Sequence, residues 1–489
     1  MRLYSKASLL AISVFAFAGL RAPASTPRAF DFGPIASRYQ DVHGEWHTTG
    51  LGPFFETATS TQDMHFTAVR PFYSRIDDPP RERIARDYLW PIATTRDLKY
   101  EQNSRFLIFF NFNHDTRSIN PRYRWWIIPF YFHGRDAQGT KYHALFPLGG
   151  TIREFLGRDE IKFWLFPIRS TSRLNDLKTS NWLWPIYSET KGDDTYRFRV
   201  FPFYMYSHRD GNYTKKSILW PIWNSAEYFH PKSSGKGHIL FPIYGHMKLT
   251  DQETWWVVPP FFRYTKGERM NMLNAPWPFI QWRKSMGTND AVDKLYIWPL
   301  YGRKRIEKLE QSFALWPILH WSTFDRGNEF QSRFFAVPFY FGETVTRKAV
   351  TNDSATVIKR SSKLWPLYSY RRKGEESRFR MLELWPFAEA AAVERNWAPF
   401  WTLYSRKAMG ENVDIELLWG LYRQQHREGG ADYYSLFPLF DWRDAAEAGP
   451  DGSRWSILKG LIGYEHADSR KRLRMLYFFT LPLGRETKP

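Results

Sequence analysis

Short apolar segments centred on proline alternate along the chain with longer polar segments. The apolar segments share one consensus, which is Leu, then Trp or Phe, then Pro, then Ile, Leu or Phe, and then Tyr. Well-formed copies occupy residues 89–92, 145–148, 165–168, 183–187, 219–223, 240–244, 315–318, 364–368 and 436–440. Recurrence of one motif along a chain is the signature of a repeat architecture.

The spacing of the motif is regular. Between Pro71 and Pro338 the prolines recur about every 19 residues, if Phe110 stands in for one missing proline. Degenerate copies continue to the neighbourhood of Phe479. We therefore expect one array of about 22 units over residues 25–489, although a length of 489 residues would suggest about three domains.

Glycine-containing turn signals lie between successive prolines, as at Gly192 and in Asp210-Gly211. We interpret each unit as one strand of about 10–14 residues followed by a tight reversal. This predicts an all-β fold, an antiparallel up-and-down meander of about 22 strands that is barrel-like. A parallel β-solenoid with coils of about 19 residues is the alternative. The meander predicts reversals near Gly192 and Gly211 and strands centred on Pro147, Pro185, Pro221 and Pro242.

The motif is apolar on both faces of such a strand. Around Pro185, Leu183 and Tyr187 would share one face, and Trp184 and Ile186 the other. A central band would then need cover on both sides. We therefore predict burial, in protein or in lipid, of the motif tryptophans Trp184, Trp220, Trp316 and Trp365.

Proline limits how such strands can pair. Because proline lacks the N–H group, it weakens the ladder on one side of its strand. This favours hairpins of about 38 residues, with a bulge or bend between them.

Two segments depart from the repeat. Residues 344–362 are polar and lack the motif, which predicts an irregular exposed loop. The Ala-rich residues 388–393 shorten the spacing and predict either a short helical connection or a skipped strand.

The N-terminus resembles a secretion signal. Arg2 and Lys6 precede the apolar run 7–20, and Ala22-Pro23-Ala24 follows it. This predicts a signal peptide over residues 1–24 and export across the inner membrane. We expect the outer membrane as destination, with the periplasm or the cell exterior as alternatives. An uncleaved membrane anchor is the competing interpretation.

Composition narrows the chemistry. The absence of Cys excludes disulfides, Cys-based zinc sites, iron–sulfur clusters and a cysteine nucleophile. A formal charge of +19 favours anionic partners, for which we name outer-membrane phospholipid or lipopolysaccharide. The 18% aromatic content is compatible with stacking on a glycan. Nucleic acid is not expected for an exported chain.

No motif for hydrolase, nucleotide or dinucleotide chemistry is present, so we predict no enzyme activity, no catalytic or cofactor-binding residue and no cofactor. His43 and His47 flank Glu45 and would share a strand face, but no third ligand is evident, and we predict no metal site.

Other polar pairs predict no site either. His238 and His246 would lie about 26 Å apart on one extended strand, too far apart for one metal ion. Asp193 and Asp194 are expected to be solvated turn residues.

The motif, as in residues 184–187, resembles the Trp/Phe-Pro-Ile/Leu-Tyr repeats of a family of uncharacterised secreted bacterial β-repeat proteins. The resemblance covers nearly all of the chain after residue 24 and supplies no catalytic residue. We expect a non-enzymatic bacterial envelope protein, an outer-membrane β-barrel or barrel-like structural or transport component. The alternative is a periplasmic or extracellular scaffold that binds glycan or another envelope component.

Overall fold

The structure is a computed structural model that describes residues 29–483, except 118, 232, 287–290, 349–354, 388, 430, 445–452 and 468–469. The predicted signal peptide, residues 1–24, lies outside the described residues. None of the described helices is long and apolar enough to cross a membrane.

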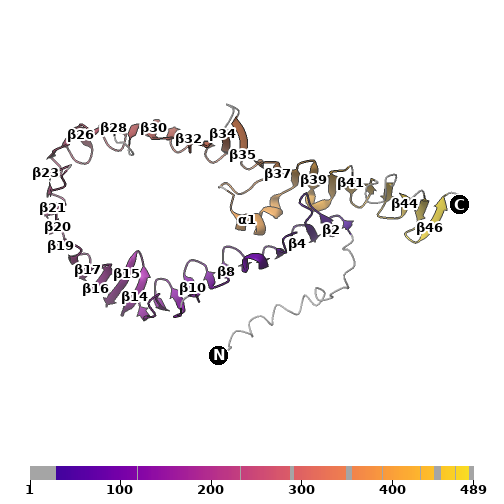
Figure 1. Cartoon of the computed structure of the whole chain (residues 1–489), viewed down its shortest axis with the longest axis horizontal. Coiled ribbons are helices and arrows are strands. Elements are labelled where there is room, and N and C mark those ends of the chain that lie inside the picture. Colours follow the sequence, from indigo (N-terminus) through magenta and orange to yellow (C-terminus); the bar gives the residue numbers. More distant parts are fainter. Residues whose placement is uncertain are drawn as a thin grey trace.

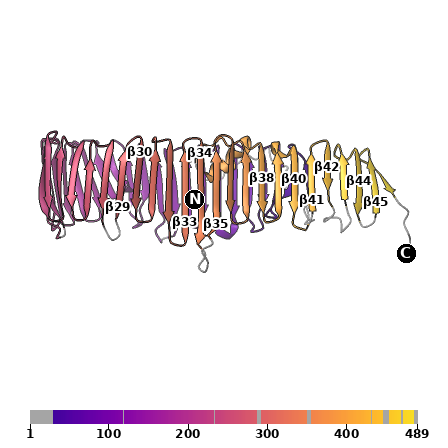
Figure 2. The same cartoon turned by 90° about the horizontal axis from the view of Figure 1, so that it is seen from above.

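The described chain forms one long sheet in which every strand pairs with the next strand in sequence (Figures 1 and 2). All of these pairings are antiparallel, as between β17 (Leu177–Trp182) and β18 (Tyr187–Gly192). The prediction of an all-β antiparallel meander is therefore confirmed. The parallel solenoid is wrong, because consecutive strands run in opposite directions.

The strands are numbered in chain order. Those of the first part are β1 (Phe30–Phe32), β2 (Ala36–Gln40), β3 (Trp46–Gly50), β4 (Phe55–Thr59), β5 (His65–Val69), β6 (Tyr73–Asp78), β7 (Arg83–Tyr88), β8 (Ala93–Leu98), β9 (Glu101–Phe106), β10 (Phe110–Asp115), β11 (Arg122–Ile127), β12 (Tyr131–Arg135), β13 (Lys141–Leu145), β14 (Gly149–Phe155) and β15 (Arg158–Trp164). The middle part holds β16 (Arg169–Leu174), β17, β18, β19 (Thr195–Val200), β20 (Tyr204–Arg209), β21 (Tyr213–Ile218), β22 (Trp223–Tyr228), β23 (Gly235–Leu240), β24 (Tyr244–Leu249), β25 (Gln252–Val257), β26 (Phe262–Gly267), β27 (Met270–Asn274), β28 (Ile280–Ser285), β29 (Val292–Ile297), β30 (Tyr301–Ile306), β31 (Leu309–Ala314) and β32 (Leu319–Asp325). The last part holds β33 (Glu329–Ala336), β34 (Tyr340–Lys348), β35 (Ala355–Leu364), β36 (Tyr368–Lys373), β37 (Glu376–Met381), β38 (Tyr404–Met409), β39 (Asn412–Leu417), β40 (Tyr422–Arg427), β41 (Ala431–Leu436), β42 (Phe440–Arg443), β43 (Ser453–Ile457), β44 (Ile462–Ala467), β45 (Arg470–Met475) and β46 (Phe479–Leu483). The helices are α1 (Ala391–Asn396) and α2 (Ala398–Trp401), and the 3₁₀ turns are η2 (Pro79–Arg81) and η3 (Leu418–Gly420).

Each repeat contributes two strands, not one. Most of the described strands have six residues, and the described residues form 46 strands in place of the predicted 22 or so. The motif prolines lie in turns: Pro185 falls between β17 and β18, so strands centred on Pro147, Pro185, Pro221 and Pro242 are wrong. The physical reason is that proline at a turn removes no ladder hydrogen bond, whereas in mid-strand it would. The hairpin is therefore the 19-residue repeat itself, half the predicted length.

The reversals near Gly192 and Gly211 are confirmed. Gly211 has a φ of +64°, in the left-handed region that glycine adopts without steric cost. Because the two kinds of turn alternate, they gather on opposite edges of the sheet. We call the edge with the proline turns the proline rim and the other the glycine rim.

The pairing has almost no stagger. Tyr187 is opposite Val200, and Val200 is opposite Tyr204, so residues at one height stay at that height from strand to strand. The strands therefore stand across the ribbon, as Figure 2 shows. A closed barrel of the usual kind requires tilted, staggered strands. In the described sheet, no pairing joins the first strand to the last, so the predicted barrel is not formed.

The ribbon curves into a loop (Figure 1). One face carries the cross-strand row that includes Asp87, Asn181 and Arg263. Asp87 contacts α1, which lies inside the loop, so this face is the inner face and the opposite one the outer face. Small residues on the concave inner face leave room for the side chains of neighbouring strands. A Cβ on Gly302, for example, would collide with the ring of Phe313 on the next strand.

The first strands of the ribbon meet a later part of it through side chains. Strands β1 to β7 lie against α1, α2 and β38 to β41, beyond which β42 to β46 continue as a tail (Figure 1). We call this junction the clasp. The helices α1 and α2 bridge β37 and β38, which confirms a helical connection near residues 388–393.

Residues 344–362 are not a loop. Residues 344–348 belong to β34 and 355–362 to β35, and the two strands pair with a register shift between Val345 and Thr346. They are the longest strands described and project past the neighbouring turns (Figure 2). The remaining tip, 349–354, lies outside the described residues.

A single layer leaves little core. The accessible surface is 32209 Å², whereas a compact monomer of 58.2 kDa would expose about 19,000 Å². The one described cluster of buried apolar residues lies on the inner face of β11 to β15 and consists of Trp126, Phe132, Ala144, Ile152 and Phe163.

Candidate functional site

The proline rim has a backbone that satisfies its own hydrogen bonds. In the turn 183–186, Ile186 N–H donates to the Leu183 carbonyl at 2.8 Å, with a cis Trp184-Pro185 peptide. This is the arrangement of a type VI turn. Leu183 and Trp184 donate to the preceding proline turn, at 2.6 and 2.8 Å.

The same pattern recurs along the rim. In the turn 219–222, the N–H groups of Leu219 and Trp220 donate to the turn before, and that of Ile222 closes its own turn. The turn 315–318 repeats all three bonds. Neighbouring turns are thus joined edge to edge, and none of these three turns leaves a backbone N–H free.

The side chains of the rim are apolar and project from the protein. Trp184, Trp220 and Trp316 each keep nearly half of their surface exposed (47–49%). The expectation that the protein buries them is wrong, because a turn at the edge of a single-layer sheet has no second layer over it. Burial of these residues in lipid stays a prediction.

The outer face changes character from one rim to the other. The row beside the proline rim is apolar or aromatic from β18 to β26: Tyr187, Val200, Tyr204, Ile218, Trp223, Leu240, Tyr244, Val257 and Phe262. The next row mixes aromatic, histidine and polar residues, such as His246 and Trp255. The row beside the glycine rim includes five lysines and lies four residues, or about 13 Å, from the first.

The clasp is polar and largely buried. The Arg423 guanidinium lies 3.5 Å from Asp31 and 3.5 Å from Glu416, and stacks 4.0 Å from the ring centre of Tyr39. Tyr433 donates to Asp31 at 2.8 Å. Arg423 is 2% exposed, so its charge depends on these partners.

A second part of the clasp involves α1. The Arg395 guanidinium and the Asn396 amide both contact Asp87, at 2.7 and 3.1 Å. Trp397 donates through its indole to the Trp90 carbonyl at 2.9 Å. All three come from the inserted helical connection, which therefore holds the loop closed.

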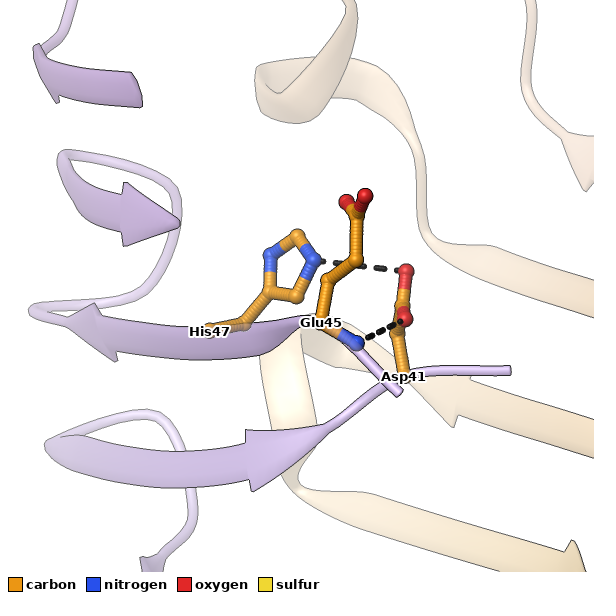
Figure 3. A group of neighbouring side chains, drawn as sticks. All are labelled: Asp41, Glu45 and His47. Atoms are coloured by element: carbon orange, nitrogen blue, oxygen red, sulfur yellow. Dashed lines mark hydrogen bonds and ion pairs between the residues drawn. The ribbon is translucent and has the colours of Figure 1, made fainter. Parts of the chain in front are cut away.

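His47 lies at the edge of the clasp, between two carboxylates. Its Nε2 is 3.3 Å from Asp41 and its Nδ1 is 3.2 Å from Glu56. Asp41 also accepts backbone N–H bonds from His43 and Glu45, one of which is drawn in Figure 3.

Asp41, Glu45 and His47 are the one group of at least three possible metal ligands, among the described residues, whose ligand atoms all lie within 4.8 Å of one another. Asp41 supplies the third group that the sequence did not reveal, because the turn 41–45 folds it back over His47. His43 is not part of the group. Every member of the group already has a hydrogen-bond or ion-pair partner. The partner of the Glu45 carboxylate is the Ser60 hydroxyl, which donates to it at 2.5 Å. The side chains of the cluster therefore have partners within the protein.

The pKa values follow from this pairing. Burial alone would lower the pKa of His47, but its contacts with Asp41 and Glu56 outweigh burial and raise the pKa to about 9. Burial alone would raise the pKa of Asp41, but His47 lowers it to about 2. His47 is therefore a cation at neutral pH.

The turns determine where the other polar pairs considered in the sequence lie. His238 and His246 are directly opposite each other on β23 and β24, because the chain reverses at Pro242; their predicted separation of 26 Å is wrong. They have different partners, Tyr244 and Glu253. Asp193 and Asp194 lie exposed in a glycine-rim turn, as expected.

No protein-family model matches this chain, and no curated protein matches it at a significant level.

Proposed function

We propose that the chain is a non-enzymatic protein of the bacterial envelope that anchors in a lipid layer through its proline rim. The observation that carries the proposal is the rim itself, in which successive proline turns expose Trp, Leu, Ile, Phe and Val side chains. Exposed apolar patches of this extent mark sites of interaction with apolar partners.

The backbone of the rim suits a lipid environment. Backbone N–H groups that enter hydrocarbon must be hydrogen-bonded within the protein. The three turns at Pro185, Pro221 and Pro317 meet this condition. Each half-exposed rim side chain would gain about 1 kcal/mol on leaving water, and the gains add along the rim.

The outer face supports the same orientation. The lysine-containing row lies about 13 Å from the apolar row, a depth that places cations near the head groups when the rim is submerged. Lys236 and Lys248 are both exposed there. The formal charge of +19 favours anionic phospholipid or lipopolysaccharide as the partner, in the outer membrane if the chain is exported.

The test is flotation of the purified protein with vesicles of phosphatidylethanolamine and phosphatidylglycerol. We expect the wild type to float and the variant Ile186→Lys/Ile318→Lys to lose at least tenfold in partitioning. Both residues are half exposed on the rim, so the change should not disturb the fold.

The matched control is Gln138→Lys/Asn328→Lys, which adds the same charge at exposed positions on the glycine rim. The control should float like the wild type. Equal flotation of both variants would disprove rim anchoring. Failure of the wild type to float, together with sedimentation on insoluble envelope polysaccharide, would favour the glycan-binding scaffold instead.

A further inference from the structure

The two faces of the middle of the ribbon differ in charge. Alternation along the strands places every acidic residue of β16 to β32 on the outer face: Glu189, Glu227, Glu253, Asp293, Glu310 and Asp325. The inner faces of the same strands carry eight cations and no carboxylate: Arg197, Arg199, Arg209, Lys215, Arg263, Arg283, Lys294 and Lys304.

Several carboxylates of the outer face have basic or histidine partners. Glu189 pairs with Lys191 at 2.7 Å, Glu253 with His246 at 2.8 Å, and Glu310 with Arg303 at 2.8 Å. Among the described residues, none of the eight inner-face cations has an ion-pair partner. The inner face is therefore a cationic surface that the protein leaves without counter-charges.

The strongest concentration lies on β28 to β30. Arg283 is directly opposite Lys294, and Lys294 is directly opposite Lys304. We call these three residues the cation ladder. Like charges directly opposite each other on adjacent strands destabilise a sheet. Their strands are about 4.8 Å apart, so the ladder spans about 10 Å along the ribbon.

The ladder is partly shielded from water, which strengthens the repulsion. All three side chains are half-buried. Lys294 donates to the side-chain carbonyl of Gln281 at 2.7 Å and lies 4.2 Å from the ring centre of Tyr296. Burial, and then the charges of Lys304 and Arg283, lower the pKa of Lys294. A neutral or acidic residue at any of the three positions would relieve the repulsion.

We propose that the cation ladder binds a phosphate-bearing ligand inside the loop that the curved sheet encloses. A phosphate oxyanion can bridge two neighbouring cations of the ladder, and a diphosphate can reach all three. Arg283 offers the planar fork that binds phosphate in a bidentate manner, and the two lysines add point charges. The inference does not depend on the rim entering lipid.

The experiment measures binding of inorganic pyrophosphate to the full chain by titration calorimetry, with thermal unfolding in parallel at constant ionic strength. The variant Lys294→Gln removes the central charge, and Lys294→Arg keeps it. The matched control is Lys216→Gln, which removes an exposed lysine from the middle row of the outer face, opposite Tyr206.

We expect pyrophosphate to bind the wild type, Lys294→Arg and Lys216→Gln, and to bind Lys294→Gln at least tenfold more weakly. Without pyrophosphate, Lys294→Gln should unfold at the same or a higher temperature than the wild type, because repulsion is relieved. A purely structural lysine would give the opposite sign.

A second arm identifies the source of the phosphate. Ladder-dependent binding to phosphatidate vesicles, but not to pyrophosphate, would assign a lipid-borne phosphate. Binding of pyrophosphate would assign a soluble one. The proposal is overturned if neither probe binds the wild type, or if Lys294→Gln binds as tightly as Lys216→Gln.

Discussion

At the scale of single residues, the clasp concentrates the titratable groups. His47 is held as a cation by Asp41 and Glu56, and Arg423 is enclosed by Asp31, Glu416 and Tyr39. Buried charges are costly unless they are paired, so these groups stabilise the junction only while the cations and their carboxylate partners keep their charges.

The charge of His47 predicts a pH dependence. Its pKa is raised to about 9 in the folded protein, above its usual value of 6.5. The stabilisation is therefore complete below about pH 6.5 and is lost as the pH rises through about 9. The effect is at most about 3 kcal/mol. Thermal unfolding from pH 6 to 9.5 should show a larger loss of stability for the wild type than for His47→Gln. Parallel curves would contradict the assignment.

At the scale of elements, the repeat consists of a hairpin and two different turns. The proline turn that joins β17 to β18 exposes its apolar side chains, whereas the apolar side chains on the inner face of β11 to β15 are buried. A residue of the same type should therefore contribute differently to the free energy of unfolding in the two places.

Two tryptophans test this difference. Trp126 is 7% exposed and donates to Tyr142 at 3.1 Å, whereas Trp184 is 49% exposed on the rim. We expect Trp126→Ala to lower the free energy of unfolding by about 3–5 kcal/mol and Trp184→Ala by about 1 kcal/mol, because only the first creates a cavity. Urea unfolding of both variants checks the prediction. Equal losses would show that the rim packs against protein.

At the scale of the whole molecule, the loop is closed by side chains and not by strand pairing. Because each strand pairs only with its neighbours in sequence, the sheet would keep its ladder if the clasp opened. Closure therefore rests on contacts such as those of Asp87 with α1 and Arg423 with Asp31.

The variant Asp87→Ala/Arg423→Ala should open the loop. We expect a larger radius of gyration by small-angle X-ray scattering and an unchanged β signal by circular dichroism. The control Arg303→Ala/Glu310→Ala removes an ion pair from the outer face, far along the chain, and should leave the radius unchanged. An unchanged radius in the clasp variant would show that other contacts hold the loop.

The sequence by itself determined the all-β class, the repeat of about 19 residues and the reversals at Gly192 and Gly211, because these follow from local chain chemistry. Near residue 391 it left a helical connection and a skipped strand as alternatives. It did not reveal that Pro185 lies in a turn. A short apolar run flanked by polar residues fits a strand centre and an apolar turn equally well, and only the position of the next paired strand separates them.

Tertiary structure decided the rest. The meeting of Asp31 with Arg423 and of Asp87 with Arg395 joins residues more than 300 positions apart, and no local pattern encodes such contacts. Asp41 joins His47 only through the fold of one turn. The acid-free inner face follows from the alternation of residues along β16 to β32. It can be recognised only once the strand boundaries are known, because a shift of one residue exchanges the two faces.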